Sequence, residues 1–497
     1  MLSSLTAFKR ANSPAPVQVS SAPPTLIQDG SYLQALGLKL SEAVTKALAL
    51  PTCPVGIMSE FVVDGKGPLP SGRGRCLGSM IASELRATEC NVNLQRAFLR
   101  ALQRALSILL TSINGHLLPL VSTPTFTAPF NLSAAGPFNP TQIHALALAT
   151  FAGELVESLE ALGLGTSPEA SSSSSASANA RSTLLIGDGL RPIREGLEGI
   201  ISKVATPLFA QIRKELLPIL EGLEHPPPAA SPALKPTLST KSVSAGQSVH
   251  PSLAAMTQAM PAYHRALAKL ADLSPIVHRA LASCLIALHW RAMISLAHRP
   301  LAVNVMATPP SATSPLPSST SLATAISGAS KKKMGGPTPP GTPAATRFLM
   351  KLPSSRPPSP QSPPTCDPLE LEAKKVYDLL SSLPKPASGD ALEAVEEGLE
   401  ALDALVNLLR VRGDPTLVPE DVPTLVALPI VLRSAGVAAS VPALTQLGEG
   451  EYYERCLGGF GRAAECGPIV ARTLRQVLDN GDATRTALLE WLQQRAA

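Results

Sequence analysis

The chain has 497 residues, enough for roughly two to four domains. Hydrophobic residues make up 45% of it and aromatic residues only 3%, so Leu, Val, Ile and Ala must fill any core, which favours helix-on-helix packing over an all-β sandwich. The net charge of +5 is small for this length and gives no global signature of nucleic-acid binding.

The chain alternates between two kinds of segment. Ala/Leu-rich segments have helical periodicity, whereas the charge-poor segments between them hold too few bulky apolar side chains to offset the entropy of ordering them. The predicted fold class is therefore all-α, with helical bundle blocks separated by long disordered Pro/Ser/Ala-rich linkers. The predicted parts are a disordered N-terminal tail (1–30), an N-terminal helical region (31–300) with disordered insertions at 166–181 and 225–250, a disordered basic Pro/Ser/Thr linker (301–366) and a C-terminal helical bundle (367–497).

In the N-terminal region apolar residues recur every three or four positions, the period of a helix with one buried face. This period predicts helices over 31–50, 92–113, 139–162, 192–223, 252–274 and 276–298. Pro207 and Pro218 should kink or divide the fourth helix, and Pro275 parts the last two. Residues 51–77 are rich in Gly and Pro, and they predict at most a short strand and turn at 61–65.

In the C-terminal region a heptad seam of apolar residues runs from Leu392 to Leu409. The seam is shorter than the three or four heptads of a free coiled coil, so it predicts packing inside a bundle. Asp390 and Glu393 form a predicted capping box at its start. Shorter helices are predicted at 421–434, 450–457, 467–479 and 483–495. The segment 450–478 gathers aromatic residues and two cysteines, and either core or binding surface fits it.

The linker 301–366 carries the candidate regulatory sites. Six Ser or Thr residues precede a proline there and are candidate phosphorylation sites: Thr308, Ser314, Thr338, Thr342, Ser359 and Ser362. They lie beside a basic cluster formed by Lys331, Lys332 and Lys333. Phosphates would reverse the charge of this linker and change its attraction to acidic surfaces.

A second group of basic residues lies on one predicted helix face, where Arg96, Arg100 and Arg104 are each four residues apart. Together with the lysine cluster, they are candidate contacts for an acidic partner, a phosphate backbone or an anionic membrane surface. The alternative is a solvated helix face, because charged runs on helices usually face the solvent.

Two further patterns are weaker. The basic, Gly-rich residues 64–75 lack the GKS or GKT ending of a P-loop, so a solvated loop is favoured over a phosphate cradle. Four histidines fall within 35 residues, at His264, His278, His289 and His298. Metal ligands need closer spacing with carboxylate or thiolate support, so the sequence favours partly exposed histidines on a helix surface and predicts neither a metal site nor a cofactor.

The longest uncharged stretch is 105–153, which contains no Lys, Arg, Asp or Glu. Asn114 and Pro119 interrupt its most apolar part, so a buried core helix is favoured over a transmembrane segment. Seven cysteines without a CxxC pair indicate a reducing compartment, which predicts a cytoplasmic or nuclear protein. Residues 1–28 loosely resemble a mitochondrial presequence, but their four prolines favour a disordered tail.

No catalytic motif is present, so the sequence predicts no enzymatic activity. The predicted function is that of a non-enzymatic helical scaffold or adaptor, which acts through protein–protein contacts and is regulated by proline-directed phosphorylation of its linkers. Two alternatives stay open. One is a peripheral subunit of a membrane-trafficking or tethering complex, and the other is a nuclear regulator that contacts nucleic acid through its basic segments.

Overall fold

The structure, a computed structural model, describes residues 25–51, 62–63, 65–88, 90–132, 136–164, 188–226, 250–300, 368–387, 389–478 and 485–496. Of these residues 78% are helical and none lies in a strand, which confirms the predicted all-α class. Nearly all of the two predicted insertions, and the whole of the linker 301–366, lie outside the described residues.

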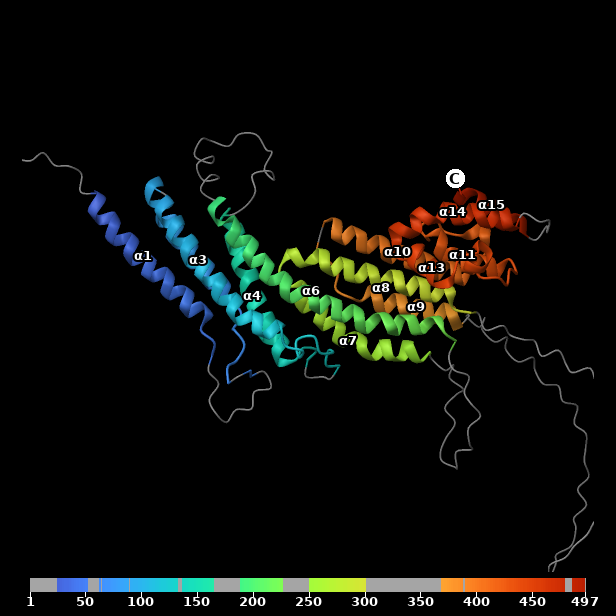
Figure 1. The fold of residues 1–497 in the computed structure, drawn as a ribbon, viewed down its shortest axis with the longest axis horizontal. Helices are drawn as coiled ribbons and strands as arrows, with labels where there is room; N and C mark the ends of the chain where they lie inside the picture. Colours follow the sequence, from blue (N-terminus) through green and yellow to red (C-terminus); the bar gives the residue numbers. More distant parts are fainter. Residues whose placement is uncertain are drawn as a thin grey trace, which may run out of the picture. The chain divides into compact units, whose positions relative to one another are not determined.

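Seven described α-helices precede residue 301 (Figure 1). They are α1 (Thr25–Leu48), α2 (Arg73–Ala87), α3 (Val92–Val121), α4 (Pro140–Ala161), α6 (Arg191–Glu221), α7 (Pro251–Ala271) and α8 (His278–His298). Helix α3 packs against α1, α4 and α6, and α2 packs against α4. Helix α6 continues the packing to α7 and α8. Neighbouring helices in the sequence are therefore mostly neighbours in space.

The helix starts follow local sequence signals. The side chain of Asn139 accepts a hydrogen bond from the Gln142 amide at 2.9 Å, and the Gln142 side chain accepts one from the Asn139 amide at 3.0 Å. This reciprocal pair is a capping box, with Pro140 at the first helical position. Asn91 caps α3 in a similar way, because its side chain accepts from two amides of the first turn.

Several elements differ from the prediction. Helix α1 begins at Thr25 rather than at residue 31. Helix α6 is not divided at Pro207 or Pro218, so of the two predicted effects of these prolines, division is wrong. A proline removes one helical hydrogen bond, and the packing of α6 against α4, α7 and α8 outweighs that loss. Instead of a strand there is an isolated bridge between Val63 and Lys66, with N–O distances of 3.1 and 3.0 Å.

The described C-terminal helices are α9 (Pro368–Ser381), α10 (Asp390–Arg410), α11 (Thr424–Ser434), α12 (Val441–Thr445), α13 (Glu449–Arg455), α14 (Phe460–Leu478) and α15 (Thr486–Ala496). Helix α10 buries the heptad seam against α8 and α9, which confirms packing inside a bundle. The capping box predicted at Asp390 is wrong. Asp390 is already helical, and Gly389, with a φ of 76°, stands at the cap position without a side-chain bond.

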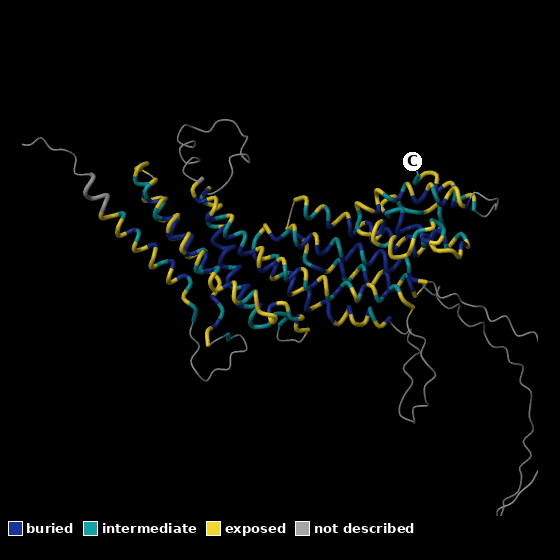
Figure 2. The backbone as a smooth tube through the Cα atoms, viewed as in Figure 1, coloured by how far each residue is buried: buried dark blue, intermediate teal, exposed yellow. Residues whose placement is uncertain are grey.

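Helices from before and after the predicted linker belong to one compact unit. Helix α8 packs against α6 and α10, and α9 and α11 also contact it. Figure 2 shows buried residues along the helices of this part of the structure. Helices of the predicted regions 31–300 and 367–497 therefore pack against one another within this unit.

Candidate functional site

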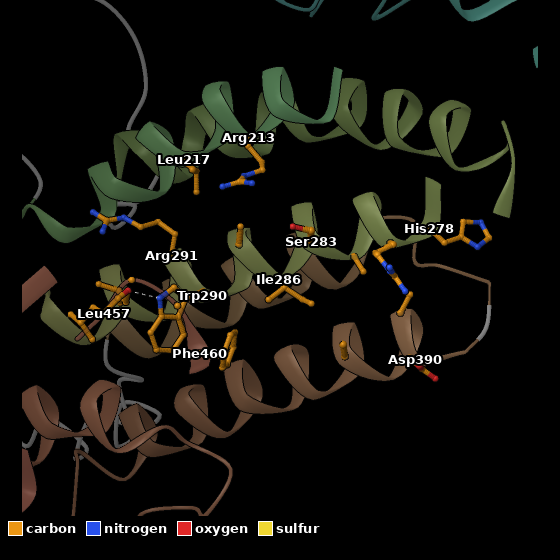
Figure 3. Close-up of a pocket in the computed structure, with 18 of the residues that line it drawn as sticks. Arg213, Leu217, His278, Ser283, Ile286, Trp290, Arg291, Asp390, Leu457 and Phe460 are labelled. Atoms are coloured by element: carbon orange, nitrogen blue, oxygen red, sulfur yellow. Dashed lines mark hydrogen bonds between the residues drawn. The ribbon is translucent and has the colours of Figure 1, made fainter. Parts of the chain in front are cut away.

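A groove with a volume of about 1190 Å³ runs along α8, between α6 on one side and α10 on the other (Figure 3). Both of these helices pack along α8. The residues of α8 that line the groove extend from His278 to Ile294, a distance of about 24 Å along a helix. The groove is thus an elongated surface at the junction of three helices that are far apart in the sequence.

The floor of the groove is an incompletely covered stripe of α8. Most of this helix is buried, which is the pattern of a helix enclosed by others on all sides. Along the groove, however, Ser283 is exposed, and Ile286 and Ala287 are only half-buried. These residues and Trp290 follow the three- and four-residue spacing of one helix face. The packing of the unit therefore leaves a stripe of α8 partly open at Ser283, Ile286 and Ala287, whereas Trp290 at its end is buried.

Two aromatic rings close one end of the groove. The rings of Trp290 and Phe460 have their centroids 4.6 Å apart, and the Trp290 indole Nε1 donates a hydrogen bond to the carbonyl oxygen of Leu457 at 2.7 Å. This bond holds the turn between α13 and α14 against α8. Large aromatic side chains in a pocket often dominate the energy of protein binding. Trp290 itself is only 7% exposed, so half-buried Phe460 is the ring at this end that a ligand can reach.

The predicted ambiguity of the segment 450–478 resolves residue by residue. Tyr452 is fully buried and belongs to the core, whereas Phe460 is half-buried and lines the groove. Core and surface roles thus alternate within one aromatic segment.

Arginines give the groove a basic rim. Arg213 of α6 and Arg279 of α8 are exposed, and neither has an acidic partner among the described residues. Arg291 differs, because its guanidinium lies 3.4 Å from Glu221 and 3.3 Å from Glu224. Figure 3 shows Arg213 pointing from α6 over α8.

A cluster of polar side chains lies next to the Trp290 end of the groove. The Tyr453 hydroxyl donates a hydrogen bond to Glu224, which also pairs with Arg291. Burial and the Glu224 carboxylate raise the pKa of Tyr453, so this phenol stays protonated and keeps donating. The His298 ring lies 5.4 Å from the Tyr453 ring, and burial lowers the pKa of His298. These contacts join α8, α13 and the short 3-10 turn Gly222–Glu224 that follows α6.

The four histidines of the sequence do not gather into a site. His264 is exposed and His278 is half-buried, as predicted, but His289 is buried against α10 and its exposure prediction is wrong. Neither ring nitrogen of His289 has a hydrogen-bond partner among the described residues. Burial lowers its pKa to about 4. Within the described part of the chain, no three His, Cys, Asp or Glu residues form a group that could hold a metal ion.

The Gly-rich basic segment forms the start of α2, so the prediction of a solvated loop is wrong for its last residues. The carboxylate of buried Glu154 accepts hydrogen bonds from the amides of Gly72 at 2.7 Å and Gly74 at 3.0 Å. A helix start attracts an anion, and here the anion is a side chain of α4. The neighbouring Arg73 binds carbonyl oxygens at the end of α1, among them that of Ala47 at 3.3 Å. This segment is used in packing.

The three predicted contact arginines, Arg96, Arg100 and Arg104, lie exposed on α3. No ion pair joins any of them to an acidic residue in the described ranges. Further along the same helix Ile108 and Leu118 are 54% and 50% exposed. The structure thus places the basic group beside an uncharged, partly apolar surface.

Two described helical stretches, Val92–Val121 and Pro275–His298, are long and apolar enough to cross a membrane by length and composition alone. Both pack against other helices of the unit, and 72% of the most apolar window of the second stretch is buried. Only 28% of the corresponding window of the first stretch is buried, so the pattern of a mostly buried core helix applies to the second stretch.

The candidate phosphorylation sites and the lysine cluster lie outside the described residues. The helices that flank their linker are joined at its two ends. The Arg299 guanidinium pairs with the Glu372 carboxylate, and both side chains are about nine-tenths buried. Arg433 donates hydrogen bonds to the carbonyl oxygens of Arg299 and Ala297, the latter at 2.6 Å. The described residues on the two sides of 301–367 therefore contact each other.

The groove could not be predicted from the sequence, because the residues that line it come from four separate segments of the chain. Only the nearly continuous apolar character of α8 hinted at a helix that needs partners on all sides. No known protein family, curated protein or solved structure matches this chain.

Proposed function

We propose that this protein is a non-enzymatic adaptor or scaffold of the cytoplasm or nucleus, and that it binds a partner protein in the α8 groove. The open apolar stripe of α8 between α6 and α10 carries this proposal. Buried helices that lack one neighbour are completed by a helix from a binding partner in many complexes. The Trp290 and Phe460 rings supply the apolar anchor that such an interface needs.

The polar residues of the groove support binding over catalysis. His278, Ser283 and Asp390 all line it, but no hydrogen bond joins any two of them. In Figure 3 the imidazole of His278 points away from Ser283. A serine nucleophile needs a base within hydrogen-bond reach, so this set lacks the geometry for acyl transfer.

A pair of matched substitutions tests the proposal. Ile286→Glu places a charge on the half-buried floor of the groove, whereas Ile108→Glu makes the same change on the exposed face of α3. Full-length protein and both variants serve as bait in cell extract, and mass spectrometry quantifies the proteins retained. We expect a stoichiometric partner that the wild type and Ile108→Glu retain and Ile286→Glu loses. Partners that Ile286→Glu retains in full, with its helix content unchanged, would refute the proposal.

The second candidate function is that of a peripheral membrane-tethering subunit. The observation in its favour is the exposed face of α3, where Arg96, Arg100 and Arg104 precede exposed Ile108 and Leu118. Basic and apolar residues on one helix face bind anionic lipid surfaces. Flotation with liposomes that contain phosphatidylserine separates the two candidates. Only the membrane candidate expects flotation of the wild type, and loss of flotation when the three arginines become glutamates.

A further inference from the structure

We propose that the occupant of the α8 groove is an acidic amphipathic helix of a partner protein. This inference rests on the proposed function, because it names the chemistry of the partner that the groove would bind. Its evidence is the juxtaposition of an apolar floor, an aromatic end and two arginines without acidic partners.

The shape of the groove selects a helix. Three helices, α6, α8 and α10, form its walls and floor, so a fourth helix would complete a bundle around the open stripe of α8. About 24 Å of floor corresponds to about 16 residues of guest helix. Side chains at positions i, i+3, i+4 and i+7 of such a guest would cover Ile286 and contact the Trp290 and Phe460 rings.

The charges of the rim select an acidic guest. Arg213 and Arg279 project at the groove without acidic partners in the described structure, and Asp390 is the one acidic residue among the lining residues. Glu221 and Glu224 lie close by but are paired with Arg291. Carboxylates on the solvent-facing flank of the guest would pair with the two free arginines.

The same charges disfavour the linker of this chain as the occupant. Residues 331–365 carry six Lys or Arg residues and no acidic residue. Their charge has the same sign as that of Arg213 and Arg279, so unmodified linker would be repelled from the rim. A partner with an acidic helix is the occupant with the complementary charge.

The two ends of the groove also predict an orientation. The aromatic rings lie at the Trp290 end, whereas Arg279 lies near the start of α8 and Arg213 lies over its middle. A guest helix should therefore place a large apolar side chain beside Phe460 and its carboxylates toward the opposite end.

The experiment uses full-length protein and three labelled synthetic peptides. One is a 16-residue amphipathic helix with Leu on one face and Glu on the other, the second has Lys in place of every Glu, and the third spans residues 340–356 of this chain. Fluorescence anisotropy gives each dissociation constant. The protein variants are Arg213→Glu with Arg279→Glu, and a matched control on α3, Arg100→Glu with Arg104→Glu.

We expect the Glu peptide to bind about tenfold more tightly than the Lys peptide, because two rim pairs each contribute a few-fold. The groove double variant should reverse this preference, and the α3 double variant should keep it. Equal affinity for the Glu and Lys peptides, an unchanged preference in the groove variant, or tighter binding of the 340–356 peptide would each overturn the inference.

Two further results separate this inference from the proposed function. If Ile286→Glu loses a captured partner but the Glu peptide shows no preference, the adaptor proposal stands and the acidic partner does not. Sedimentation of the protein alone tests a second copy as occupant. A dimer that Ile286→Glu converts to monomer would also overturn the inference.

Discussion

The imidazole of His289 lies inside the packing of α8 against α10. Its side chain is 1% exposed, and a Cβ on Gly398 would lie 3.2 Å from its Nδ1, so the two helices approach closely there. Desolvation lowers the pKa of His289 to about 4, and the charge of Lys385 acts in the same direction. The neutral ring is therefore the form that the fold accommodates.

This pKa predicts an acid-sensitive fold. An unfolded histidine has a pKa near 6.5, so the unfolded chain takes up the proton before folded His289 does. The contribution of neutral His289 to the free energy of unfolding should be fully present above pH 6.5. On acidification to pH 4, the free energy of unfolding should fall by about 3 kcal/mol. Urea unfolding at pH 7 and pH 4 measures this difference.

The variant His289→Leu should lose most of that pH dependence, whereas His264→Leu, on an exposed position of α7, should keep it. The pKa of His298 is lowered as well, so a smaller pH dependence of the free energy of unfolding should remain in His289→Leu. An identical pH dependence in wild type and His289→Leu would show that His289 is not the group responsible.

At the scale of elements, helix existence followed from local periodicity, whereas helix partners did not. The period of apolar residues and the Asn139 cap were sufficient to predict α4. Helix α2 was missed because Gly-rich residues suggest a loop, and its start depends on Glu154 from 80 residues further along the chain. The groove was missed for the same reason, since Arg213, Trp290 and Phe460 lie on separate elements.

Glycine-to-alanine substitutions at two helical positions should change the free energy of unfolding in opposite directions, because one glycine lies in the α2–α4 contact and the other does not. A Cβ on Gly74 would lie 2.7 Å from the Glu154 Cβ and closer still to the carbonyl oxygen of Phe151. Gly74→Ala should therefore lower the free energy of unfolding by about 1 to 3 kcal/mol, as overpacking does. Gly115 on α3 has open space around its Cβ position, so Gly115→Ala should raise this free energy by about 0.5 to 1 kcal/mol through helix propensity.

Thermal and urea unfolding of the two variants measure both effects. A stabilising Gly74→Ala would mean that α2 does not approach α4 as closely as the structure shows. The surface pair of Arg75 and Glu157 on the same two helices offers a control, because its exposed side chains should contribute little.

At the scale of the whole molecule, the described residues that flank two long segments of the chain contact each other. The Arg299–Glu372 pair and the hydrogen bonds of Arg433 join the two ends of the linker. A similar contact lies at the second predicted insertion, where the buried His250 ring lies 3.0 Å from the carbonyl oxygen of His225.

This closure predicts that the linker is dispensable for folding. Replacing residues 303–365 by eight Gly and Ser residues should leave the circular dichroism spectrum of the helices unchanged. It should raise the free energy of unfolding by about 2 kcal/mol, because a shorter loop costs less entropy to close. Glu372→Ala, which leaves Arg299 buried without its partner, should instead lower it by about 3 kcal/mol. Loss of helix content in the shortened protein would show that the linker belongs to the fold.

By itself the sequence determined the helical class, most helix positions and the buried seam of α10, because each depends on residues within a few turns of one another. Only the tertiary structure decided that α8 is left open along one stripe, that Glu154 caps α2, and that Arg299 meets Glu372. These features depend on contacts between residues up to 167 positions apart, and local periodicity carries no information about which helices meet. The proposed binding site belongs to this second group.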